Sequence, residues 1–397
     1  MMIDMHFRKF FLATAVFAVA TASCSGPGGN SPIVTPTRTS TPTPTPPPAG
    51  PFAYVSNGSA NVFAYTISAT TGALTPVAGS PFAAGTNPWG LAIDPSAKFA
   101  YVANNGSANV SAYTINAATG ALTPVAGSPF AAGTGPRGVE VDPTGTFAYV
   151  ANNGSASVSA YTINAATGAL TAVAGSPFAA GINPVAVACD PSGAFAYVTN
   201  LSDGTVSAYT INAATGALTP VAGSPFAAGT FPSGLAVDPS GKFAYVTNEG
   251  DNDVSAYTIN ATTGALTPVA GSPFAAGSSP IRAVVDPTGK FAYVTNIGSA
   301  SISAYTINAT TGALTPVAGS PFAAGTGPWG VAVDPTGTFA YVANNGSANV
   351  SAYTINATTG ALTPMAGSPF AAGTNPIGVA VWSPRSIKSA SSGSRQY

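Results

Sequence analysis

The chain has 397 residues, with 45 Gly, 36 Pro, 6% charged residues and a formal net charge of −1. Hydrophobic residues make up 46% of the chain, which excludes disorder throughout, because disordered chains are poor in apolar residues and rich in charge. The charge balance excludes a basic protein that neutralises nucleic-acid phosphates. The single His, His6, leaves the bulk of the chain without the imidazole of Ser-His-Asp triads and His-ligated zinc sites.

The N-terminus has the pattern of an export signal. Arg8 and Lys9 precede an apolar run over residues 10–20, which is too short to span a bilayer and typical of a secretory signal. The next residues, 21–24, read Thr-Ala-Ser-Cys and resemble a bacterial lipobox, although Thr21 stands where Leu is preferred. We expect a signal peptide over residues 1–23, a lipid on Cys24 and a place in the bacterial cell envelope, attached to the membrane only through that lipid. The alternative is ordinary cleavage after Ala22 and secretion.

Two segments outside the central part of the chain cannot form a packed core. Residues 24–50 are rich in Thr and Pro, and repeated Pro favours an extended polyproline II linker. Residues 385–397 are rich in Ser and are expected to be disordered. The domain therefore extends over residues 51–384.

One motif repeats seven times within this domain. The string Phe-Ala-Tyr-Val recurs every 47 or 48 residues, beginning at Phe52, Phe99, Phe147, Phe195, Phe243, Phe291 and Phe339. A period of about 40–50 residues with several strands in each unit is typical of β-propellers. A β-solenoid is the alternative, but its coils are usually shorter than this period.

Each repeat has four candidate strands, here taken from the third repeat at residues 147–151, 158–163, 169–174 and 185–189. The third strand carries a Pro in six of the seven repeats, and Pro cannot donate to a ladder, so this strand belongs at the outer edge. The fourth is wholly apolar in most repeats, as expected for an innermost strand covered on both faces. The sequence predicts an all-β fold, a seven-bladed β-propeller of four-stranded blades.

The frame of the repeat predicts how the ring closes. The first copy begins at Phe52 without a preceding inner strand, and the last ends with an inner strand, residues 378–381, that has no blade of its own. The C-terminal strand should therefore pair into the N-terminal blade, which removes the open sheet edge.

The repeat resembles the lactonase-type seven-bladed propellers and the YVTN surface-layer repeats. The resemblance rests on residues 135–154 and 158–171 and their copies, and residues 197–200 spell Tyr-Val-Thr-Asn. It covers about residues 52–383 and implies the propeller fold. The family includes 6-phosphogluconolactonases, a muconate-lactonising branch and exported proteins without assigned activity. Its enzymes gather His and Arg around the channel mouth, and no such His exists here to carry over.

The positions where the near-identical repeats differ suggest a ligand-binding surface. Beside the Pro that starts each inner strand stand Trp89, Arg137, Phe231 and Trp329. In a propeller this connection lies near the axis on one face. The two Trp could stack on a sugar or peptide ring and Arg137 could pair with an anion, or these positions have drifted neutrally.

Two charges interrupt the apolar inner strands, Glu140 and Arg282. A charge there is costly unless it is paired or hydrated, so both are expected to face the central channel, with Glu140 paired to Arg137 or Arg282. The same three residues are the only weak candidates for catalysis.

Acidic residues provide the remaining candidates. The loop with Glu249, Asp251 and Asp253 has oxygen ligands at alternate positions, a weak calcium signal without the full spacing of a calcium motif. Six Asp that precede Pro in the turn after the inner strand are better explained as turn caps. No cofactor or resident metal is expected.

The sequence favours a non-catalytic, exported binding module over an enzyme. Between Phe52 and Pro384 there are five Lys or Arg and eleven Asp or Glu, which leaves few positively charged donors to bind a phosphorylated lactone. Near-identical blades also argue against a specialised catalytic site. The expected partner is a protein, glycan or envelope polymer, and the expected state is a monomer. The alternatives are a lactonase-like hydrolase and a structural surface protein.

Overall fold

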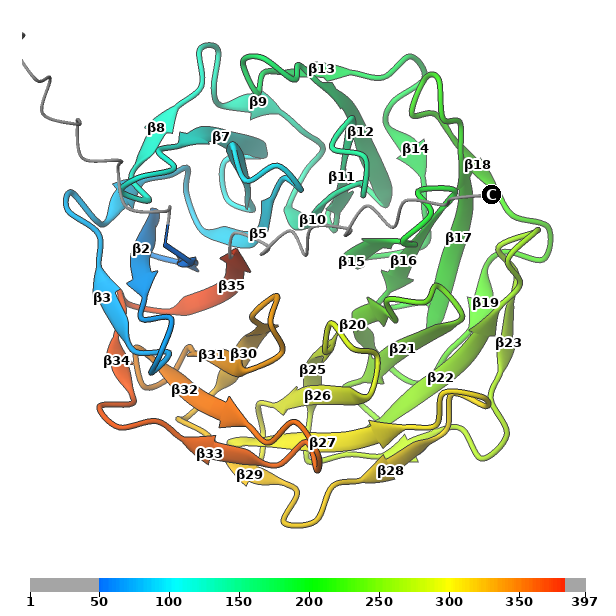
Figure 1. The fold of residues 1–397 in the computed structure, drawn as a ribbon. Helices are drawn as coiled ribbons and strands as arrows, with labels where there is room; N and C mark the ends of the chain where they lie inside the picture. Colours follow the sequence, from blue (N-terminus) through cyan, green and yellow to red (C-terminus); the bar gives the residue numbers. More distant parts are fainter. Residues whose placement is uncertain (1–49, 383–397) are drawn as a thin grey trace, which may run out of the picture. The chain divides into compact units, whose positions relative to one another are not determined.

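The computed structural model describes residues 50–382. The expected signal peptide, Cys24, the linker up to residue 49 and the tail from residue 385 lie outside the described residues. Residues 50–382 form an all-β ring of seven blades around a central axis (Figure 1). They contain no helix that could cross a membrane.

The strands of every repeat follow one order. The first strand, Phe-Ala-Tyr-Val and two more residues, is β1 (Phe52–Asn57), β6 (Phe99–Asn104), β11 (Phe147–Asn152), β16 (Phe195–Asn200), β21 (Phe243–Asn248), β26 (Phe291–Asn296) and β31 (Phe339–Asn344). The second is β2 (Asn61–Ile67), β7 (Asn109–Ile115), β12 (Ser157–Ile163), β17 (Thr205–Ile211), β22 (Asp253–Ile259), β27 (Ser301–Ile307) and β32 (Asn349–Ile355). The third is β3 (Leu74–Pro76), β8 (Leu122–Pro124), β13 (Leu170–Ala172), β18 (Leu218–Pro220), β23 (Leu266–Pro268), β28 (Leu314–Pro316) and β33 (Leu362–Pro364).

Two further strands complete the repeat. A two-residue Phe-Ala strand is β4 (Phe82–Ala83), β9 (Phe130–Ala131), β14 (Phe178–Ala179), β19 (Phe226–Ala227), β24 (Phe274–Ala275), β29 (Phe322–Ala323) and β34 (Phe370–Ala371). The inner strand is β5 (Pro88–Ile93), β10 (Pro136–Val141), β15 (Pro184–Cys189), β20 (Pro232–Val237), β25 (Pro280–Val285), β30 (Pro328–Val333) and β35 (Pro376–Trp382).

Strand pairing confirms the predicted blade order. Each inner strand pairs with the first strand of the following repeat, and the third strand, with its Pro, lies at the outer edge, as in β10-β11-β12-β13. The two-residue strand was not predicted: it lies inside the Pro- and Gly-rich connection and pairs beside the third strand on the same second strand. Each blade thus has four main strands and one short addition at its rim.

The inner strands are less completely buried than the expected cover on both faces implies. All six residues of every first strand are buried, whereas inner-strand residues such as Leu91, Val284 and Val331 are half-buried. The physical reason is that an inner strand pairs along one edge only and borders the axial channel on the other. Its apolar residues line the channel, and several of them, such as Val139 and Leu235, also belong to the apolar clusters between blades.

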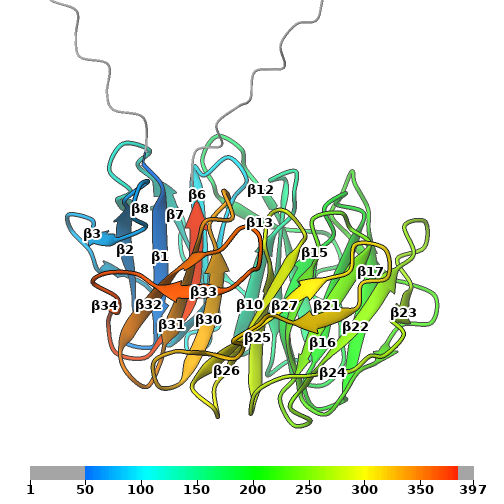
Figure 2. The same ribbon diagram turned by 60° about the horizontal axis from the view of Figure 1, so that its bottom comes forward.

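The ring closes as predicted, by the C-terminal strand in the N-terminal blade. β35 pairs antiparallel with β1 (Figure 2). Phe52 stands opposite Trp382, with ring centroids 6.4 Å apart. Val379 and Val381 of β35 pack against the apolar cluster of the last blade. This latch leaves no unpaired inner position in the ring.

Buried tyrosine hydroxyls join every pair of neighbouring blades. The Tyr of each first strand donates to a glycine carbonyl in the next blade at 2.7–3.0 Å, as Tyr197 does to Gly264. The Tyr of each second strand donates to an alanine carbonyl of the preceding blade at 2.6–2.7 Å. All seven junctions, including the closing one, therefore have the same pair of hydrogen bonds.

Replacing Tyr197 with Phe should destabilise the propeller by about 1–3 kcal/mol, because the buried Gly264 carbonyl loses its donor. Urea unfolding at equilibrium would measure the loss. Thr210→Val is the matched control, since Thr210 makes an exposed hydrogen bond to Thr219 and should change stability by less than about 0.5 kcal/mol. Equal effects of the two substitutions would contradict a special role for the buried hydroxyl.

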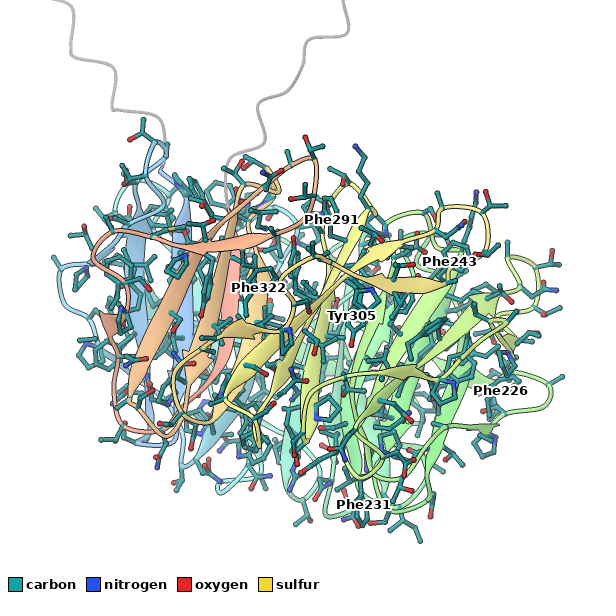
Figure 3. All side chains as sticks on the ribbon, turned by 90° about the horizontal axis from the view of Figure 1, so that it is seen from below. Phe226, Phe231, Phe243, Phe291, Tyr305 and Phe322 are labelled. Atoms are coloured by element: carbon teal, nitrogen blue, oxygen red, sulfur yellow. The ribbon has the colours of Figure 1, made fainter. Side chains whose placement is uncertain are left out.

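The two faces of the ring differ in the elements they carry. The turns between first and second strands lie with the starts of the inner strands, joined by bonds such as Asn105 N–H to the Asn87 carbonyl; we call this the mouth face. The opposite face carries the Asp-Pro turns and both ends of the described chain, Gly50 and Trp382. Figure 3 shows Phe231 on the mouth face and Phe243 and Phe291 toward the opposite one.

Candidate functional site at the channel mouth

A cavity of about 210 Å³ lies on the axis and is lined by residues from all seven inner strands. Two charged side chains border it, Glu140 from β10 and Arg282 from β25. A second space of about 270 Å³ continues along the axis and shares Leu91, Glu140 and Val331 with the first. Both charges therefore border the channel, and Glu140 stands where the two spaces meet.

Glycine brings the inner strands close together at the top of this cavity. The third inner-strand residue is Gly in five of the seven repeats, and a Cβ at Gly138 would lie 2.7 Å from the Val185 carbonyl of the neighbouring strand. Arg282 occupies this same position in β25. It is thus the one large side chain at a level where the other repeats have Gly or Ala, a contrast that an alignment of the repeats could have revealed.

Buried hydroxyls join some of the inner strands, and sequence reasoning missed them. Thr199 accepts from the Ala186 N–H at 3.0 Å and donates to the Ser233 carbonyl of the next inner strand at 2.9 Å. Equivalent contacts come from Ser56, Thr247 and Thr295, whereas the other three repeats have Ala there. The Thr of Tyr-Val-Thr-Asn therefore links neighbouring inner strands. Its position in the repeat, where other copies have Ala, is the feature of the sequence that could have indicated this role.

Among residues 50–382 no cation acts on the pKa of Glu140, so the predicted ion pair with Arg137 or Arg282 is wrong. Burial, with a smaller contribution from Asp142, raises the pKa of Glu140 to about 8. Burial, followed by the nearby charge of Arg137, lowers the pKa of Arg282 to about 10. The two side chains project from strands on different sides of the ring, so they share a cavity without meeting.

At the mouth, Trp89, Arg137 and Trp329 contact one another; we call them the mouth cluster. The guanidinium carbon of Arg137 lies 4.3 Å from the centre of the Trp89 ring. The rings of Trp89 and Trp329 meet edge to face, with centroids 5.3 Å apart at 88°. Three positions that differ among the repeats therefore form one half-buried surface, which the sequence could suggest but not assemble.

The mouth cluster contains hydrogen-bond donors without acceptors. Trp89 Nε1, Trp329 Nε1 and Arg137 Nε are buried and have no partner among the described residues. Burial lowers the pKa of Arg137, and the negative charge of Glu249 opposes this change. Because a buried donor without an acceptor costs free energy, the cluster favours a ligand or water that supplies acceptor oxygens.

Phe231 lies apart from the mouth cluster. It is 50% exposed and lines a separate surface pocket with Leu201, Asp203 and Asp251. The structure thus divides the four predicted ligand-binding residues into one group of three and one separate residue.

The acidic loop does not gather its carboxylates. Asp251 accepts from the Thr230 N–H at 2.6 Å, and Asp253 accepts from the Asn248 amide at 2.7 Å. Glu249 lies toward Arg137, whose charge counters the rise that burial causes in the pKa of Glu249. Within residues 50–382 no three His, Cys, Asp or Glu are arranged to hold a metal ion.

The Asp-Pro turns are caps, as the sequence indicated. One carboxylate oxygen of each Asp accepts the N–H of the Phe that starts the next strand at 2.6–2.7 Å, as Asp190 does from Phe195. The buried Cys189 lies beside one of these turns and is unpaired.

Comparison with known proteins agrees with the fold. Among curated proteins no sequence matches the chain. Similar solved structures include a putative 6-phosphogluconolactonase of Bacteroides fragilis (21% identity, 85% of this chain and 99% of that one, TM-score 0.75) and one of Bacteroides uniformis (20%, 84% and 99%, 0.74). A third is the periplasmic gluconolactonase of Pseudomonas aeruginosa (20%, 84% and 99%, 0.71).

The sequence signature of one family covers nearly the whole propeller. The family described as lactonase, 7-bladed β-propeller matches residues 47–130, 125–281 and 186–375. These overlapping matches are expected of a chain with near-identical repeats, and they confirm the resemblance drawn from those repeats. The chain therefore belongs to the lactonase, 7-bladed β-propeller family.

Proposed function

We propose that this protein hydrolyses a lactone in the axial cavity, with Glu140 and Arg282 as the reacting groups. The observation that carries the proposal is the carboxyl of Glu140, whose pKa is raised to about 8, in one cavity with the guanidinium of Arg282. A general base works best when its pKa lies near the operating pH. The family match supports this reading over the non-catalytic module that the sequence favoured.

The proposed reaction adds water across the ester bond of the lactone ring. Ionised Glu140 takes a proton from water as the water oxygen attacks the lactone carbonyl carbon. Arg282 stabilises the negative charge that develops on the carbonyl oxygen. The ring C–O bond then breaks, and Glu140 returns its proton to the leaving alkoxide, which gives a hydroxy acid.

A non-catalytic binding module is the second candidate. The mouth cluster favours it, because its stacked Trp and Arg side chains and unpartnered donors suit a ligand whether or not a reaction follows. The third possibility, a purely structural surface protein, explains neither the mouth cluster nor the charges in the cavity. Export and lipid attachment at Cys24 remain predictions from the sequence.

Hydrolysis should increase with pH as Glu140 loses its proton. At pH 7 only about a tenth of a group with a pKa of about 8 is ionised, so kcat should rise close to tenfold between pH 6 and pH 7 and level off above pH 8. Release of acid from sugar lactones by the purified protein, corrected for spontaneous hydrolysis, would measure this. A rate that is no higher than the spontaneous rate at every pH would refute the proposed hydrolase and leave the binding module.

A further inference from the structure

We propose that the mouth cluster is a binding site for a sugar ring that carries a carboxylate, either free or as a residue of a glycan. This inference goes beyond lactone hydrolysis, because the site needs no reaction to be occupied. Trp89, Arg137 and Trp329 contact one another, and Trp89 also lines the axial cavity.

The charges at the mouth favour an anion. Arg137 lies close enough to Arg282 to lower the pKa of Arg282, and no carboxylate of the described residues 50–382 counters this change. Two guanidiniums that repel each other without a bridging carboxylate are stabilised when an anion binds near them.

The net charge of the side chains at the mouth favours a ligand with a single negative charge. The acid near Arg137 is Glu249, and Glu140 is largely protonated at pH 7 because its pKa is about 8. Two positive charges and the one negative charge of Glu249 leave an excess of one. A carboxylate neutralises that excess and matches the planar fork of a guanidinium, whereas a phosphate dianion would leave an uncompensated negative charge.

The aromatic side chains and the free donors favour a sugar as the body of the ligand. The edge-to-face arrangement of Trp89 and Trp329 gives the mouth apolar walls that suit the C–H face of a pyranose ring. The buried Nε1 groups of both Trp, and Nε of Arg137, lack acceptors, and the ring and hydroxyl oxygens of a sugar could supply them. A uronate combines these hydroxyls with the carboxylate.

The position of the three Trp allows a direct test. Trp382 is the third Trp of the chain and lies on the opposite face, stacked on Phe52. In a Trp382→Phe protein the fluorescence of tryptophan therefore reports the mouth alone. D-Glucuronate and D-galacturonate are added as the free sugar acids and trigalacturonate as the glycan of the second, with D-glucose as the neutral ring and glucose 6-phosphate as the dianion.

We expect saturable quenching by glucuronate or trigalacturonate, and affinity at least about tenfold weaker for glucose, which lacks the charge-assisted bond. Arg137→Gln should reduce glucuronate affinity by about tenfold and reduce glucose affinity by clearly less, because only glucuronate loses the charge-assisted bond, and Arg137→Lys should restore part of the glucuronate affinity. The relative affinities of D-galacturonate and trigalacturonate identify the source of the carboxylate.

Three results would overturn this proposal: no saturable change with any of the uronates, equal affinity for glucose and glucuronate, or tighter binding of glucose 6-phosphate than of glucuronate. None of the uronates is a lactone, so this titration is independent of the hydrolase proposal. A protein that binds uronate without lactone turnover would retain this inference and lose the proposed enzyme.

Discussion

Glu140→Gln is expected to lower kcat for lactone hydrolysis by about a hundredfold to ten-thousandfold, the usual contribution of a general base. The amide keeps the shape of the side chain but cannot take a proton from water. The pH dependence between pH 6 and pH 8 should disappear with it, because the group that titrates near pH 8 is gone. Initial rates of acid release across this pH range, with wild type measured in parallel, would show both effects.

Measuring the stability of Glu140→Gln distinguishes a loss of catalysis from a folding defect. The folded pKa of Glu140 is raised from 4.5 to about 8, so between these values the folded state holds a proton that the unfolded state releases. Stability of the wild type should therefore fall as pH rises from about 5 to 8, and Glu140→Gln should be free of this loss. Equal kcat in both proteins, with both folded, would remove Glu140 from the mechanism.

Ending the chain after Asn375 should cost several kcal/mol, a large part of the 5–15 kcal/mol that typically stabilises a domain. This truncation removes β35, whose pairing with β1 closes the ring. It exposes the inner edge of β1 and the apolar cluster against which Val379 and Val381 pack. We expect a much lower thermal midpoint and association through the open edge, since unpaired strand edges template aggregation.

A chain that ends after Pro384 is the matched control, because it lacks the Ser-rich tail and keeps the latch. Thermal unfolding and size-exclusion chromatography of both truncated proteins would test the role of β35. If the two proteins unfold at the same temperature and elute alike, the closing strand does not stabilise the ring as we argue.

Much of the architecture could be predicted because the same sequence pattern occurs in seven repeats. The period of 47 or 48 residues gave the number of blades, and the Pro of the third strand gave the outer edge. The offset between Phe52 and the last inner strand gave the closure. The short Phe-Ala strand was missed because two residues are too few to show a periodic pattern. The half-burial of the inner strands was missed because a run of apolar residues has the same sequence pattern whether it lies in a closed core or along a channel.

The candidate site required the tertiary structure. The sequence determined which residues depart from the repeat, among them Trp89, Arg137, Glu140 and Arg282. It could not determine that Arg137 stacks on Trp89 while no cation within residues 50–382 acts on Glu140. These residues lie on different blades, and their separations depend on how seven inner strands converge around the axis. Ring closure decides that geometry, and no local pattern in the chain encodes it.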